Sequence, residues 1–149
     1  MRIALGADHG GYQLKNVILN HLKEQGYETL DLGTNSDESV DYPKFAFAVG
    51  QTVRENEADL GILVCGTGIG VSMTANKIPG IRAAVCTDTY CARMTREHND
   101  ANILALGARV VGSGLALDIV DAFLKTEFAG GRHARRVDMM TQVEQGKKL

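Results

Sequence analysis

The sequence has no large excess of charge of either sign, since 16 lysines and arginines stand against 18 aspartates and glutamates. Proteins that bind nucleic acid or a membrane surface usually carry a basic excess, so we expect neither partner. The sequence also lacks an apolar run of the roughly 20 residues that a membrane-spanning helix needs. Its first residues, MRIALGADHGG, become polar too early for a signal peptide. These absences predict a cytoplasmic protein.

Cysteine is scarce, and its spacing excludes the common zinc motifs. The three cysteines, Cys65, Cys86 and Cys91, form no CxxC pair and no quartet with histidine. We therefore expect no metal, and without a secretory context we expect free, reduced thiols. Cys86 and Cys91 lie in no motif, and we interpret both as structural.

Internal repeats, low-complexity segments and linkers are also absent. A chain of 149 residues has the length of one domain and is long enough to bury a core. We predict a single domain over residues 1–149.

What the sequence does contain is a regular alternation of apolar and amphipathic segments. Apolar segments predict five strands, at residues 2–8, 27–33, 60–66, 82–88 and 102–112. The segments between and after them predict helices at residues 11–26, 42–58, 70–77, 114–128 and 132–145, and from residue 89 to at least 94. The expected inward positions are Leu14, Val17, Ile18 and Leu22 in the first helix, and Ala116, Ile119, Val120, Phe123 and Leu124 in the helix at 114–128.

Apolar strands separated by helices are typical of a parallel sheet covered on both faces. With right-handed crossovers, we predict a three-layer α/β/α, doubly wound, Rossmann-like fold with a further C-terminal helix. We expect the strand order 2-1-3-4-5. Ligands of such sheets bind at the carboxyl ends of the strands, where the order reverses. That point lies between the first and third strands, so Asp8 and His9 should face Cys65.

The loop after the third strand contains Gly66, Gly68 and Gly70 and leads into a helix, whose free N–H groups attract anions. One interpretation is a dinucleotide site, with Asp88 as the later acid, although Val71 replaces the third glycine of that motif. The other is an anion hole for a small substrate. A thiol at a helix N-terminus gains thiolate character, so Cys65 could abstract a proton next to a carbonyl. The alternative is a small core residue at a strand end.

Two further polar clusters allow either a functional or a structural interpretation. Asp8 and His9 could bind a ligand, or Asp8 could cap the first helix. His98 and Asn99 could belong to an active site or to a solvated helix end. Their helix runs antiparallel to the strands, so its end should lie far from Cys65. If His98 works with Cys65, another subunit supplies it, which predicts a dimer with shared sites.

Arginines near the C-terminus form a third cluster. Arg132 and Arg136 lie four residues apart, on one face of the predicted helix, and two guanidinium groups so placed can bind a phosphate. The alternative is a solvated basic face. Spacing leaves open whether Arg135, on nearly the same face, contributes.

The motifs GADHGG, DYP, ILVCGTGIGVS, ANK, GIRAAVC, EHNDANILALGARVVG and GGRHARRV occur in that order over essentially the whole chain. The sequence thereby resembles the ribose-5-phosphate isomerase B family, part of a sugar-phosphate isomerase group that includes galactose-6-phosphate isomerase subunits. The resemblance implies an isomerase without metal or cofactor and an active site built across a homodimer interface, with the pairing of dimers into tetramers left open. Of two branches of the family, the presence of Cys65 and of Val71 in place of a glutamate favours the one with a cysteine base.

The resemblance also implies individual roles. Cys65 would move the proton between C1 and C2, Thr67 would support it, and His98 would open the furanose ring. The remaining residues would bind substrate: Asp8, His9, Tyr42, Gly66, Gly68, Ile69, Gly70, Asn99, Arg109, Arg132 and Arg136.

We therefore expect an aldose–ketose isomerase that interconverts D-ribose 5-phosphate and D-ribulose 5-phosphate through a cis-enediolate, a step of the pentose phosphate pathway. Two alternatives stay open. One is the same chemistry on a six-carbon substrate such as allose 6-phosphate or galactose 6-phosphate. The other is a non-catalytic domain that binds a nucleotide or a sugar phosphate.

Overall fold

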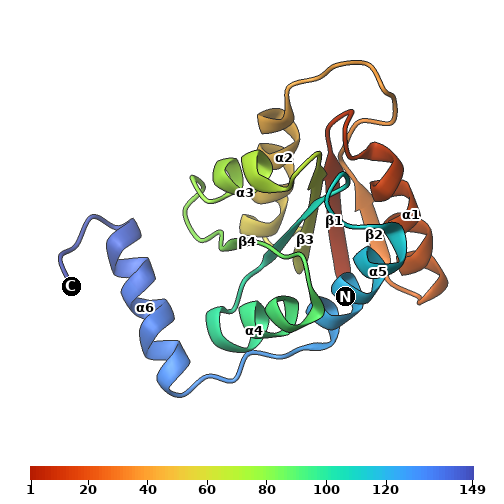
Figure 1. Ribbon diagram of the computed structural model, residues 1–149. Coiled ribbons are helices and arrows are strands. Elements are labelled where there is room, and N and C mark those ends of the chain that lie inside the picture. The colour runs from red at the N-terminus through yellow and green to blue at the C-terminus, as the bar shows by residue number, and fades with distance from the viewer.

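The computed structural model describes all residues from 1 to 149 and contains five strands and six helices (Figure 1). The strands are β1 (Arg2–Ala7), β2 (Glu28–Asp31), β3 (Leu60–Cys65), β4 (Ala83–Val85) and β5 (Ile103–Gly107). The helices are α1 (Tyr12–Glu24), α2 (Tyr42–Arg54), α3 (Ile69–Ala75), α4 (Thr89–Asn99), α5 (Ser113–Lys125) and α6 (Arg132–Glu144). Every predicted segment overlaps one of these elements. α3 and α5 each begin one residue before the predicted start, and α4 continues beyond residue 94 to Asn99.

The strands form one parallel sheet in the order β2-β1-β3-β5-β4. The predicted α/β fold is confirmed, but the predicted order 2-1-3-4-5 is wrong for the last two strands. β5 is buried along its whole length, whereas none of the three residues of β4 is fully buried. An inner strand is covered on both faces, so the more apolar β5 lies beside β3 and the short β4 forms the edge. The reversal of strand order between β1 and β3 is unaffected.

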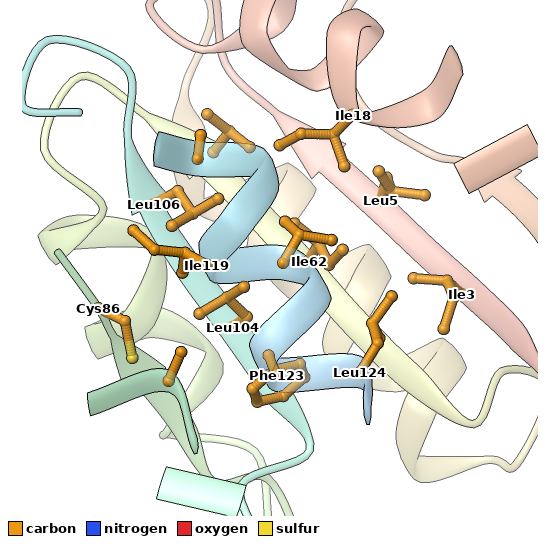
Figure 2. Close-up of a cluster of buried hydrophobic side chains, with 14 of the residues drawn as sticks. Ile3, Leu5, Ile18, Ile62, Cys86, Leu104, Leu106, Ile119, Phe123 and Leu124 are labelled. Atoms are coloured by element: carbon orange, nitrogen blue, oxygen red, sulfur yellow. The ribbon is translucent and has the colours of Figure 1, made fainter. Parts of the chain in front are cut away.

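Helices cover both faces of the sheet and bury two separate cores. α1, α4 and α5 contribute to the core on one face, and α2 and α3 contribute to the core on the other (Figure 1). In Figure 2, α5 lies across β3 and β5, with Ile119 and Phe123 near Leu104 and Ile62. Right-handed crossovers account for this division, because each change in the direction of travel along the sheet moves the connecting helix to the other face.

The inward face of α5 matches its prediction, and that of α1 differs at one position. Ala116, Ile119, Val120, Phe123 and Leu124 of α5 are all buried. The buried residues of α1 are Leu14, Lys15, Ile18, Leu19 and Leu22. Val17 is 40% exposed, so its predicted inward position is wrong. The buried stripe widens on the opposite side, toward Lys15 and Leu19, because β2 and the loop that follows it cover that side.

The predicted C-terminal helix is confirmed as α6, which extends away from the sheet and packs against α4 (Figure 1). Few hydrogen bonds connect α6 and the segment before it to the rest of the chain. The Ala129 N–H donates to the Glu97 carbonyl oxygen at 3.0 Å, and the Gly80 N–H donates to Glu144 Oε1 at 2.9 Å. None of the helices combines the length and apolarity that crossing a bilayer demands.

Candidate active site

Cys65 is the last residue of β3, and the loop behind it folds back over its sulfur atom. The side chain is 5% exposed, and the Gly68 N–H donates to Cys65 Sγ at 3.0 Å. Gly68 has φ of +80°, a left-handed conformation that glycine adopts without strain, and its neighbour Ile69 begins α3. The Ile69 N–H donates to Thr67 Oγ1 at 3.3 Å. The glycine loop therefore directs the Gly68 N–H toward the thiol, as the anion-hole interpretation expects.

Strand β5 holds this loop from the other side. The Ala108 N–H donates to the Cys65 carbonyl oxygen at 2.8 Å, and the Arg109 N–H donates to the Gly66 carbonyl oxygen at 3.0 Å. The Arg109 guanidinium group lies beside Gly66 and is exposed. The swapped strand order is the cause, because it makes β5 rather than β4 the neighbour of β3. Arg109 thus comes to the mouth of the site directly from the end of β5.

Asp8 and His9 follow β1 and lie across the strand-order reversal from Cys65. Asp8 is 8% exposed, and its Oδ1 accepts a hydrogen bond from the Gly10 N–H at 2.9 Å. The N-cap of α1 is Gly11, with no side-chain cap, so the interpretation of Asp8 as a helix cap is wrong. His9 Nδ1 accepts from the Val40 N–H at 3.2 Å. An acceptor at Nδ1 leaves the proton of the neutral imidazole on Nε2.

The Tyr42 ring packs directly against Gly70, which follows the glycine loop in the first turn of α3. Tyr42 begins α2, and a Cβ atom at Gly70 would lie 2.7 Å from Tyr42 Cζ. Only glycine permits this approach of the ring to α3. The structure thus brings together the predicted residues of β1, β3, β5 and the start of α2, namely Asp8, His9, Tyr42, Cys65, Gly66, Thr67, Gly68, Ile69, Gly70 and Arg109. We call this set the strand-end cluster.

A cavity of about 440 Å³ adjoins the strand-end cluster. His9 and Arg109 line it, together with Asp37 and with Ser113 at the beginning of α5. An imidazole, a guanidinium group and the free N–H groups of a helix N-terminus all favour an anion. The cavity therefore suits the charged end of a small substrate.

The remaining predicted residues form a second set, the helix-end cluster of His98, Asn99, Arg132 and Arg136. His98 and Asn99 end α4, and the two exposed arginines lie in the first turns of α6. The chain returns from α4 at Asn102, whose carbonyl oxygen accepts from the Gly61 N–H near the start of β3. Cys65 lies four residues further along β3, a rise of about 13 Å. The structure therefore separates the two clusters within one chain.

His133 belongs to the helix-end cluster and was missed from the sequence. Its ring stacks on that of His98, with centroids 4.2 Å apart and planes 5° from parallel. Burial lowers the pKa of His133 below its ordinary value, and the nearby positive charges of His98, Arg132 and Arg136 lower it further. A neutral ring can stack on His98 without charge repulsion. The available signal was its position next to Arg132 in the segment GGRHARRV, where the sequence analysis considered only the arginines.

Asp100 gives the end of α4 its shape and has a structural role. It takes the left-handed conformation that ends the helix, and its carboxylate accepts hydrogen bonds from Arg82 at 3.1 Å and Arg96 at 2.8 Å. The Arg82 Nε–H also donates to the Asn99 carbonyl oxygen at 3.0 Å. These contacts fix the backbone from which His98 and Asn99 project.

The other two cysteines differ from Cys65 in their surroundings. Cys86 is buried, and burial, with nearby Cys91 and Asp88, raises its pKa to about 12. Cys91 is exposed, and its hydrogen bond with Asp88 raises its pKa. Both thiols stay protonated near neutral pH and are poor bases or nucleophiles.

The alternative of a dinucleotide site finds little support in the position of Asp88. Asp88 is the N-cap of α4, and its Oδ1 accepts from the Cys91 N–H at 2.7 Å. It follows the edge strand β4, which is separated from β3 and its glycine loop by β5. Val71, the departure from the dinucleotide motif, is fully buried in the core beneath α3. No group of three or more histidine, cysteine, aspartate or glutamate side chains has an arrangement that would hold a metal ion.

Comparisons with known proteins agree with this architecture. The family described as Ribose/Galactose Isomerase matches residues 3–140. The chain is 52% identical over 144 residues to ribose-5-phosphate isomerase B of Escherichia coli strain K12, and the match covers 97% of each chain. It is 49% identical over 146 residues to the putative sugar phosphate isomerase YwlF of Bacillus subtilis, covering 97% of this chain and 98% of the relative.

Several solved structures are also similar to this chain over nearly its whole length. Ribose-5-phosphate isomerase B of Clostridium thermocellum is 61% identical with a TM-score of 0.97, and the match covers 98% of this chain and 99% of that one. The enzyme of Mycoplasma genitalium, solved with ribulose-5-phosphate bound, is 45% identical with a TM-score of 0.93, covering 97% and 96%. Since both the family match and these relatives span nearly the whole sequence, the chain belongs to the ribose/galactose isomerase family.

Proposed function

We propose that the protein is an aldose–ketose isomerase that interconverts D-ribose 5-phosphate and D-ribulose 5-phosphate. The observation that carries the proposal is the buried Cys65 thiol at the end of β3, covered by a glycine loop whose Gly68 N–H points at the sulfur. A family relative binds ribulose-5-phosphate in its solved structure. A strand-end thiol among backbone donors suits proton transfer next to a carbonyl, because the same donors stabilise the enediolate oxygen.

In this mechanism the Cys65 thiolate removes the proton from C2 of the open-chain aldose and returns it to C1. In the same conversion O2 loses its hydroxyl proton and O1 gains one, so that the carbonyl moves from C1 to C2. N–H groups of the loop 66–70 and the Asn99 side chain hold the cis-enediolate oxygens as their charge develops. Thr67 supports the base, and Asp8 and His9 orient the sugar hydroxyls. His98 donates and accepts the protons that open the furanose ring, which must precede the transfer at C2.

The phosphate group occupies the mouth of the cavity beside Arg109. Arg132 and Arg136, one turn apart on α6, bind its oxygens in the proposal, and their exposure in the single chain leaves them free to do so. Tyr42 closes the side of the pocket next to Gly70.

The active site in this proposal is shared between two copies of the chain. Support comes from the distance between the two clusters, since His98 and Cys65 lie toward opposite ends of the sheet. It comes also from exposed apolar residues near the strand-end cluster, where Ile69 is 54% exposed and Met73 is 63% exposed. A second copy that covers them with its own α4 and α6 brings His98, Asn99, Arg132 and Arg136 to Cys65. Each subunit then contributes one domain of residues 1–149.

The proposal assigns the enzyme to the cytoplasm. A cysteine base must remain a free thiol, and Cys65, Cys86 and Cys91 are all free. A reducing compartment preserves that state.

The test is ketose formation from ribose 5-phosphate, allose 6-phosphate and galactose 6-phosphate, each with and without a chelator. We expect the highest kcat/KM for ribose 5-phosphate and no effect of the chelator. A preference for either six-carbon substrate would reassign the substrate while keeping the chemistry. Turnover of none of them would overturn the proposal in favour of a binding domain, and loss of activity with chelator would overturn the metal-free mechanism.

A further inference from the structure

Lys15 of α1 is a fully buried cation that the proposed mechanism does not use. Its side chain has no exposed surface, and its Nζ donates three hydrogen bonds of 2.7 Å each. Two go to the carboxylate oxygens of Asp31 and one goes to Asn35 Oδ1. An ammonium group has three donors, so all are satisfied. Burial of a charge is costly unless it is paired in this way, so such an arrangement needs an explanation.

The partners of Lys15 lie at the end of β2 and in the loop that leads from it toward the strand-end cluster. Asp31 ends β2, and Asn35 lies in the loop 32–41 between β2 and α2. Within the loop, the Gly33 N–H donates to Asp31 Oδ1 at 3.2 Å, and Asn35 Nδ2 donates to the Gly33 carbonyl oxygen at 3.3 Å. The Thr34 N–H donates to the Ala7 carbonyl oxygen at 3.0 Å. Lys15 therefore ties the first half of the loop to α1, and the Thr34 N–H ties it to the end of β1.

The second half of the loop reaches His9. The Val40 N–H donates to His9 Nδ1, and it is the one hydrogen bond that residues 36–40 make to the strand-end cluster. The same half contributes Asp37 to the wall of the 440 Å³ cavity, which His9 and Arg109 also line. Since residues 36–40 have no other such bond, their position depends on the fixed points at Asn35 and at the start of α2.

We propose that Lys15 is a positioning residue that holds the loop 32–41 in place and thereby fixes the tautomer of His9. With Val40 donating to Nδ1, the neutral His9 ring carries its proton on Nε2 and presents an N–H donor rather than an acceptor to the cavity. A substrate oxygen can accept a hydrogen bond from that donor. The identity of the substrate rests on the proposed function, whereas the tautomer of His9 does not.

Two variants separate this role from simple stabilisation of the core. Asn35→Ala leaves the Lys15–Asp31 pair intact and removes the bond from Lys15 to the loop, together with the bond from Asn35 to the Gly33 carbonyl oxygen. Because Asn35 is exposed, water can replace its oxygen at Nζ. Lys15→Met with Asp31→Asn removes the pair without leaving an unpaired buried charge. The matched control is Asp121→Asn, which weakens the hydrogen bond from His21 that joins α1 to α5 and the bond from Lys125 within α5, far from the loop.

The first measurement is the tautomer of His9 in the ligand-free protein, from its ring ¹⁵N chemical shifts. We expect the Nε2–H form in the parent and in Asp121→Asn, and a mixture of both tautomers in Asn35→Ala and in the Lys15/Asp31 double variant. Retention of the pure Nε2–H form in both test variants would overturn the proposal, whether or not any sugar phosphate is turned over.

The second measurement is the kinetics with ribose 5-phosphate, well below the melting temperature of each variant. Loss of one oriented hydrogen bond should raise KM by about three- to tenfold, with kcat changed much less. Asp121→Asn should lower the melting temperature and leave KM unchanged. An equal rise of KM in Asp121→Asn would show that lost stability alone accounts for the effect, and would also overturn the proposal.

Discussion

The strand-end and helix-end clusters are built on different kinds of support. Cys65 and Asp8 are buried, and their loops are bonded to neighbouring strands. Arg132 and Arg136 are exposed on α6, which packs against α4 through the stacked rings of His133 and His98. A base that must reach two adjacent carbon atoms needs a rigid frame, whereas long cationic side chains reach a phosphate from a looser one. In the proposed dimer, the helix-end cluster completes its geometry against a second copy of the chain.

The two clusters also differ in what surrounds their ionisable groups. The thiol of Cys65 accepts a hydrogen bond from a backbone N–H, a donor whose position the loop fixes. At the helix end, His98, His133, Arg132 and Arg136 place several potential positive charges close together, with Glu97 as a counter-charge 3.8 Å from His98. Such a group attracts a dianion, and the phosphate of a sugar phosphate is one.

The largest effect should come from the strand-end cluster, in Cys65→Ala. Loss of the base should lower kcat by about 10²–10⁴-fold, with KM changed little, because the phosphate contacts remain. The measurement is steady-state ketose formation. Cys91→Ala is the matched control, since that thiol is exposed and lies outside both clusters. A Cys65→Ala enzyme as active as the control would remove Cys65 from the mechanism.

The next largest effect should come from the arginines of the helix-end cluster. In Arg132→Ala or Arg136→Ala, loss of a charged hydrogen bond of about 1.5–3 kcal/mol should raise KM by about 10- to 100-fold, with a smaller change in kcat. Arg135→Ala, on the same turn of α6, tests whether the third arginine shares the phosphate. If all three variants kept the parent KM, the basic face would be merely solvated.

The smallest effect should be the pH response of the His98–His133 stack. The pKa of His133 is lowered in the folded chain, chiefly by burial, so the unfolded chain binds the proton more readily. The contribution to stability is therefore complete above the ordinary pKa of 6.5 and falls as the pH drops below it.

His133→Phe keeps a stacked ring and removes the titration. Urea unfolding from about pH 5 to pH 8 should show the parent losing stability relative to this variant on the acid side only. If the free energy of unfolding changed with pH by the same amount in both proteins, protonation of His133 would have no effect on stability.

Much of the fold could be predicted because strong local patterns and the global fold agree. The apolar run of β3 is buried throughout, and the predicted inward face of α5 is correct at every position. The reversal between β1 and β3 follows from the alternation of strands and helices. The order of β4 and β5 does not, because two short apolar strands compete for one inner position, and only their packing against α3, α4 and α5 decides between them.

The residues of the candidate site could be predicted from the sequence more readily than the residues that hold them in position. The glycine loop, Cys65 and the pair Asp8 and His9 stand at the ends of strands, where topology brings them together. Lys15 was missed because lysine in an amphipathic helix is ordinarily solvated. Its place within the buried stripe of α1 becomes meaningful only when Asp31 and Asn35, distant in sequence, supply partners. His133 was missed for the same reason, since its partner His98 lies on another helix.

The central claim is that the two clusters of one active site come from different copies of the chain. The most direct test mixes inactive Cys65→Ala with inactive His98→Ala under conditions of subunit exchange and measures isomerase activity. Random exchange makes half of the dimers mixed, each with one complete site, so about a quarter of the parent activity should return. No recovered activity, with mixed dimers confirmed by native mass spectrometry, would contradict the claim.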